Sequence, residues 1–141
     1  MKTYRFNEGE LQIPDAWKDL TVHSFVVPAA SGSGTASVVI TRDADTPARD
    51  AQHYVDLQMV EAAQKLKGFQ LVDRRATTAG GQPAAELTYT WTTPDRAKVK
   101  QRQVCIRQNE AFLIVTVSAK ADDFPKHENA LEAVVRSLRL R

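Results

Sequence analysis

The strands expected from this sequence are apolar on both faces. Residues 20–27 contain two alternating apolar sets: one is Leu20, Val22 and Val26, and the other is Phe25 and Val27. The same holds for two later apolar runs, Val38–Ile40 and Phe112–Val117. A sheet with one face in water alternates apolar and polar side chains, so this pattern predicts a sheet that is covered on both faces. Helices, a second copy of the chain or an apolar ligand can supply that cover.

Helical periodicity is confined to two stretches, of which the first spans residues 47–67. Pro47 suits the first helical position, and Gly68 is a typical stop. The apolar stripe of this helix consists of Ala51, Tyr54, Val55, Met59, Ala62 and Leu66. Gln58 falls inside the stripe and is the most unexpected polar position in the chain.

The second helix should follow Asp122 and Asp123, which can cap its start, and end near Arg136. Its inward residues should be Leu131, Val134, Val135 and Leu138. The remaining pattern predicts strands at 4–6, 11–13, 20–27, 36–42, 69–79, 83–93, 99–108 and 111–119. This order predicts an α+β fold in one domain over residues 1–141: a curved antiparallel β-sheet with two main helices packed on one face. Two helices suffice for one layer, so we expect a second copy or a ligand on the other face.

In the later strands, the bulkier alternating residues should lie under the helices. These residues are Leu87, Tyr89, Trp91, Val104 and Ile106. Earlier in the chain, Pro28–Gly34 is predicted to be a flexible hairpin loop. It has neither the lysine of a P-loop nor the spacing of a dinucleotide fingerprint, so we expect it to bind no phosphate.

Charge and composition exclude several classes of protein. The chain has 19 Lys and Arg against 17 Asp and Glu, with the basic residues scattered, so we expect no nucleic-acid partner. Cys105 is the only cysteine, which rules out an internal disulfide and fits a reducing compartment. Residues 1–8 lack the apolar core of a signal peptide, and no apolar run reaches the ~20 residues of a membrane span. These features predict a cytoplasmic protein without stable membrane insertion.

Motifs for catalysis and metal binding are weak. The three histidines, His23, His53 and His127, lack the spacing of metal ligands. Cys105 lies in the middle of a strand, where a small inert core residue is usual. No nucleophile is combined with a base and an orienting group. We therefore expect no enzymatic activity, no catalytic residue, no metal and no cofactor.

Gln58 and Gln103 each place a long amide on a surface of apolar or small residues. One interpretation is a buried glutamine bonded to nearby backbone. The other is an amide that can donate to and accept from a partner whose own polar groups are unpaired in an apolar setting. The residues alone leave both interpretations open.

The opening of the chain, Tyr4–Phe6 followed by Leu11–Trp17, resembles that of the Eag chaperones of type VI secretion. Further similarities are Arg42-Asp43, Tyr54-Val55 with Gln58, Gly68-Phe69 and Arg102-Gln103-Val104. The order of elements is also similar over nearly the full length. The resemblance implies a DcrB-like domain with a Mog1/PsbP-type α+β fold.

The resemblance also implies a function. Eag chaperones are cytoplasmic homodimers that hold the N-terminal transmembrane helices of secreted toxin effectors in a cupped β-surface and help to load the effector on the secretion spike. On this chain, Val22 and Val39 would line the cup, and Gln58 and Gln103 would be its polar contacts. Ser24 occupies a lining position where a larger apolar residue is expected. Small residues would permit close helix approach: Ser37, Thr41, Thr88 and Thr90.

Two alternatives belong to other functional classes. A DcrB-like domain could bind lipid or another apolar small molecule as a monomer. A small enzyme with residues that converge in space would instead show a deep pocket with a strongly shifted titratable group.

Overall fold

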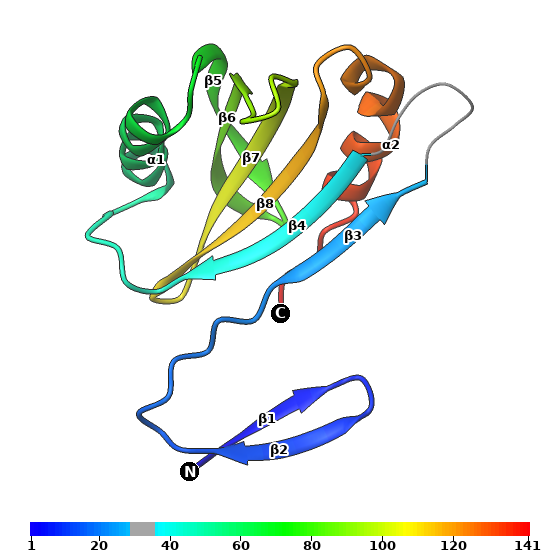
Figure 1. Cartoon of the computed structure of the whole chain (residues 1–141). Coiled ribbons are helices and arrows are strands. Elements are labelled where there is room, and N and C mark those ends of the chain that lie inside the picture. The colour runs from blue at the N-terminus through cyan, green and yellow to red at the C-terminus, as the bar shows by residue number, and fades with distance from the viewer. Residues whose placement is uncertain (29–35) are drawn as a thin grey trace.

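The computed structural model describes residues 1–28 and 36–141. A small two-stranded sheet is formed by β1 (Lys2–Phe6) and β2 (Gly9–Ile13). The main sheet has six strands in the order β3-β4-β8-β7-β6-β5, with antiparallel neighbours throughout (Figure 1). These strands are β3 (His23–Val27), β4 (Ala36–Asp43), β5 (Gln70–Ala79), β6 (Gln82–Thr92), β7 (Lys98–Gln108) and β8 (Ala111–Lys120). The helices are α1 (Ala51–Lys65) and α2 (Phe124–Arg136).

The predicted α+β fold with a curved antiparallel sheet is confirmed by this strand order. The predicted loop Pro28–Gly34 lies, except for Pro28, outside the described part of the chain, which omits residues 29–35. The main sheet ends in two edge strands, β3 and β5, each with a single neighbour.

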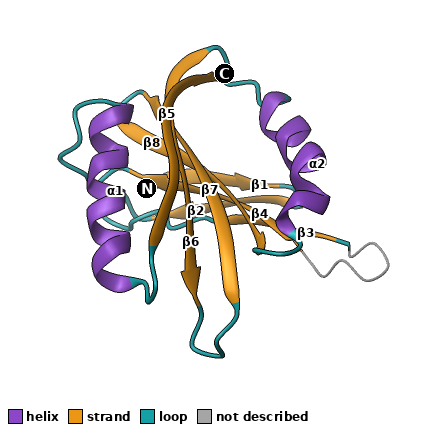
Figure 2. Cartoon of the chain, turned by 90° about the horizontal axis from the view of Figure 1, so that it is seen from above, coloured by secondary structure: helices purple, strands orange, loops and turns teal. Residues whose placement is uncertain are grey.

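The two helices lie on opposite faces of the main sheet (Figure 2). Antiparallel partners share a side, so Ala85 and Cys105 mark one face, and Ala84 and Ile106 mark the other. α1 packs with the Ala85 and Cys105 set, whereas Val135 of α2 packs with the Ala84 and Ile106 set. We call these the α1 face and the α2 face.

The prediction that both helices pack on one face is therefore wrong. The sequence of a strand shows that side chains on both of its sides are apolar. It does not show which helix will pack against each side. Leu87 and Tyr89 lie on the α1 face, as members of its core cluster, while Val104 and Ile106 lie on the α2 face. All four residues are buried as expected, under two helices rather than one.

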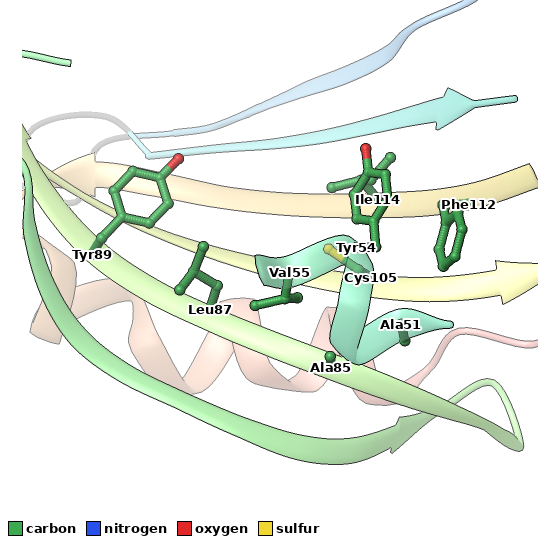
Figure 3. Packing of buried hydrophobic residues seen from close by; sticks show 9 residues of the cluster. All are labelled: Ala51, Tyr54, Val55, Ala85, Leu87, Tyr89, Cys105, Phe112 and Ile114. Carbon is green, nitrogen blue, oxygen red and sulfur yellow. The ribbon is translucent and has the colours of Figure 1, made fainter. Parts of the chain in front are cut away.

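α1 begins four residues later than the predicted Pro47. The reason is Asp50, whose side chain accepts a 2.8 Å hydrogen bond from the backbone N–H of His53 and caps the helix. Tyr54 anchors the helix, because its ring stacks on Phe112 at a centroid distance of 4.6 Å and its hydroxyl donates to Asp43 at 3.0 Å. Figure 3 shows Tyr54 among the other buried side chains of the α1 face.

α2 begins and ends near the predicted residues, and Leu131 is buried as expected. Val134 is half exposed, so its predicted inward position is wrong; the helix turns that position away from the sheet. Charged groups on the α2 face fasten the helix. Arg102 on β7 donates to Glu128 and Glu132 of α2 at 3.1 Å each and pairs at 3.2 Å with the buried Glu86 of β6.

Candidate binding surface on the α1 face

α1 covers only part of its face of the sheet. Its core cluster takes residues from β6, β7 and one end of β8, and none from β3 or β4. One cross-strand row continues beyond the helix and crosses five successive strands, as the pairings show: Ser24 with Val39, Val39 with Thr116, Thr116 with Gln103, and Gln103 with Leu87. We call the first four side chains of this row the central row; its members are Ser24, Val39, Thr116 and Gln103.

A second row runs beside the central row on the same face. It contains Val26, Ser37, Ser118, Gln101 and Tyr89. Ser37 and Ser118 share a hydrogen bond of 2.9 Å, and Gln101 accepts one of 2.6 Å from the indole N–H of Trp91. The surface thus combines valines with small hydroxyl side chains, a composition that lets a helix backbone approach closely.

Gln58 and Gln103 meet at the border between α1 and this surface. Both line a pocket of about 160 Å³, together with Tyr89 and Leu66. Gln58 comes from α1 and Gln103 from β7, 45 residues further along the chain. The tertiary structure therefore brings the two predicted polar residues to one place.

One half of the Gln103 amide is paired poorly and the other half is unpaired. Its Nε2 donates to the hydroxyl of Tyr89 at 3.4 Å, near the upper limit for a hydrogen bond. Its Oε1 is buried and has no partner among the described residues. Rotation of the amide by 180° would exchange the unpaired acceptor for an unpaired donor, so one polar end stays unsatisfied in either orientation. A buried unpaired amide costs free energy unless a partner satisfies it.

The other predicted residues fall around this centre. Val39 and Ser24 belong to the central row, and Thr41 pairs with Ile114 on the same face. Val22 lies just before β3 and is half exposed, two residues from Ser24. Thr88 and Thr90 were expected to help a helix approach, but both are buried on the α2 face, so that expectation is wrong. Thr88 instead accepts a hydrogen bond from Arg102.

Sequence reasoning missed Thr116 and Gln101. Thr116 interrupts the apolar run Phe112–Val117, and this interruption was the available signal. It stands between Val39 and Gln103 because β8 lies between β4 and β7, an order that the sequence does not reveal. Gln101 has the same parity as Gln103 in β7 and so faces the same side.

Three titratable side chains buried on the α1 face have raised pKa values: Cys105, Tyr89 and Tyr54. Burial raises the pKa of Cys105 to about 12 and that of Tyr89 to about 12. The pKa of Tyr54 is raised as well, first by burial and then by its hydrogen bond to Asp43. In residues 1–28 and 36–141, no group of three or more His, Cys, Asp and Glu is placed to hold a metal ion. Across the same residues, neither helix has the length and apolarity needed to cross a bilayer.

A larger cavity of about 430 Å³ opens on the α2 face. Its lining includes Arg75, Glu86 and Arg102, of which Arg102 is the one that binds α2. Arg75 and Arg102 both bind the Glu86 carboxylate, at 2.6 and 3.2 Å. Because these charges satisfy one another, the cavity is explained by the attachment of α2.

Comparisons with known proteins agree with this architecture. The DcrB family model matches residues 8–137. Over 138 residues, which are 98% of this chain and 95% of the relative, the sequence is 36% identical to a Pseudomonas aeruginosa protein named Effector EagT6. The crystal structure of PA94, a Pseudomonas aeruginosa protein of unknown function, has a TM-score of 0.89 at 35% identity and covers 100% of this chain and 97% of that one.

Two more distant structures share the fold alone. LpqN of Mycobacterium tuberculosis has a TM-score of 0.53 at 20% identity, over 85% of this chain and 80% of that chain. The PsbP protein of Synechocystis sp. PCC 6803 has a TM-score of 0.55 at 14% identity, over 99% and 92%. The predicted PsbP-type fold and the resemblance to Eag proteins are thereby confirmed. This chain belongs to the DcrB family.

Proposed function

We propose that this protein is an effector-specific chaperone and adaptor of type VI secretion, which shields N-terminal transmembrane helices of a toxin effector and aids its loading on the spike. The relationship to the protein named Effector EagT6 supports the effector-associated role. The observation that carries the proposed binding mode is the central row, where Val39 and Thr116 lead to the unpaired amide oxygen of Gln103.

A transmembrane helix suits this surface because it is apolar around its whole circumference. Each Å² of apolar surface removed from water contributes about 25 cal/mol, so a few hundred Å² on the central row and its neighbours would contribute several kcal/mol. The short side chains of Ser24, Ser37 and Thr41 would let a cargo helix approach the sheet closely. Ser24 in place of a larger apolar residue favours a cargo helix that packs closely at that point.

The two glutamines would give the surface its polar specificity. Gln103 Oε1 is buried and unpaired, so it would accept a hydrogen bond from cargo once its side chain turns outward, and Gln58 lies across the same pocket. A cargo helix with a serine, threonine or exposed backbone group there would satisfy the amide away from water, where such a bond matters most. The proposed assembly is a cytoplasmic homodimer that contacts the spike through its effector.

Co-expression with an N-terminal transmembrane fragment of a type VI effector tests this proposal. We expect a soluble complex that copurifies without detergent and is lost in Val39→Asp, because a charge in the central row would be buried unpaired. Val134→Asp is the matched control: this valine is half exposed on α2, away from the α1 face, and its change should leave binding intact. A lipid-loaded monomer that ignores the fragment would contradict the chaperone function and support binding of apolar small molecules.

A further inference from the structure

The N-terminal hairpin of β1 and β2 is amphipathic. The strand register places four apolar side chains on one side, namely Tyr4, Phe6, Leu11 and Ile13. The other side is polar: Arg5 pairs with Glu10 at 3.3 Å, and Gln12 donates to Thr3 at 2.7 Å. A two-stranded sheet is marginal in water by itself, and an apolar face needs a surface to pack on.

The hairpin does not bind the main sheet of its own chain. Among the described residues, the hydrogen bonds and ion pairs that leave residues 1–13 all end in the connection 14–22, such as the 2.9 Å bond between Tyr4 and Thr21. The connection is tied to the body by ion pairs of Lys18 with Asp45 and of Asp19 with Arg42. Figure 1 shows the hairpin set apart from the six-stranded sheet.

Large apolar side chains stay exposed in this part of the molecule. In the connection, Trp17 is 62% exposed and Leu20 is 73% exposed. On the edge strand β3, Phe25 is 58% exposed and pairs with Val38, so it lies on the α2 face, away from the proposed cargo surface. Among the residues that the structure describes, no strand lies beside the outer edge of β3.

We infer that residues 1–22 form an arm that packs its apolar side over Phe25 and β3 of a second copy, in a reciprocal exchange. This inference rests on the homodimer of the proposed function and not on cargo binding. In a two-fold dimer, the arm of each chain packs on β3 of the other chain. The arm and β3 are therefore covered in both copies by the same kind of contact. The connection turns at Pro14–Trp17, where the Trp17 N–H donates to the Pro14 carbonyl at 3.0 Å, and it leaves the hairpin outside the six-stranded sheet of its own chain, where a neighbouring subunit can meet it (Figure 1).

The exposed area fits a second copy of this size. Phe6, Leu11, Trp17, Leu20 and Phe25 together leave roughly 600 Å² of side-chain surface exposed, at about 120 Å² each. A standard interface buries about 800 Å² per partner, of which ~65% is apolar in homodimers. The arm and Phe25 therefore hold about the apolar area that a stable homodimer needs.

Mixed cross-linking of the full chain tests the exchange. A tagged Leu11→Cys chain and a differently tagged Phe25→Cys chain are unfolded together, refolded and oxidised; the native Cys105 is fully buried. We expect a covalent product that carries both tags and has about twice the 15.7 kDa chain mass. Thr3→Cys on the polar side of the hairpin replaces Leu11→Cys as the matched control and should give little product.

A second measurement covers the case in which a cysteine variant folds poorly. Trp17→Ser should raise the dimer dissociation constant by about 10- to 100-fold in sedimentation, the loss typical of a buried aromatic at an interface. A dimer without the mixed product, and with Trp17→Ser unchanged, would overturn the arm exchange but leave the proposed function standing. A cross-link within single chains of a Leu11→Cys/Phe25→Cys double variant would also overturn it. A wild-type chain that stays monomeric would overturn both the exchange and the homodimer.

Discussion

Val39 on β4 and Gln103 on β7 both pair with Thr116 of β8, so the two side chains lie in one row on the α1 face although 64 residues separate them. This row connects the apolar part of the surface near the β3 edge to the polar pocket beside α1. We expect residues of this row to bind cargo, and residues buried under the helices to stabilise the fold.

Ile106 and Val39 should separate stability from binding. Ile106 is fully buried on the α2 face, so Ile106→Ala should lower the free energy of unfolding by about 2–5 kcal/mol, measured by urea denaturation. Val39→Asp should leave unfolding nearly unchanged and abolish cargo binding. Equal destabilisation by the two changes would show that Val39 belongs to the core.

Gln58→Ala and Gln103→Ala should weaken cargo binding by about 1–3 kcal/mol, since each removes a partner for a polar group in an apolar setting. Their melting temperatures should stay close to that of the wild type, because Gln103 Oε1 satisfies no described residue. Calorimetry with a solubilised transmembrane fragment measures both effects. Gln101→Ala is the control: it deprives the Trp91 indole of its acceptor and should lower stability by about 1 kcal/mol. Wild-type affinity in both glutamine variants would refute their polar role.

Arg102→Met should destabilise the protein by about 3–5 kcal/mol, because Glu86 is 5% exposed and would lose one of its two cationic partners. Replacement of the acid as well, in Arg102→Met/Glu86→Leu, should recover much of the loss by removing the uncompensated charge. Chemical denaturation of the three proteins measures this. If the double variant were less stable than Arg102→Met, this would show that Glu86 stabilises the fold even without Arg102.

Stability should fall as the pH rises above about 9. The pKa of Cys105 is raised to about 12 in the folded state from an ordinary value of 9.0. Between these values the unfolded chain has lost the proton that the folded chain still holds, so each increase in pH favours unfolding. The raised pKa of Tyr89 adds to the effect at higher pH. Denaturation from pH 8 to 11 measures the decline, which should be shallower in Cys105→Ala; an unchanged slope would contradict the role of Cys105.

Local patterns in the sequence were enough to predict each element. Proline and glycine signals, alternation and the stripe around Tyr54 located both helices and all eight strands within a few residues. The predicted start of α1 at Pro47 was wrong, because the Asp50 side chain caps the helix three residues later. Gln58 and Gln103 could be singled out because a polar residue in an apolar context is visible in the sequence itself.

The faces of the sheet were decided by tertiary structure alone. Alternation determined that Gln103 and Val104 point to opposite sides, but each side is apolar in some strands, and either could have received either helix. Strand order, which places β8 between β4 and β7, selects Thr116 as the link between Val39 and Gln103. The reason is physical: alternation is a property of one strand, whereas register and helix placement depend on contacts between residues far apart in the chain.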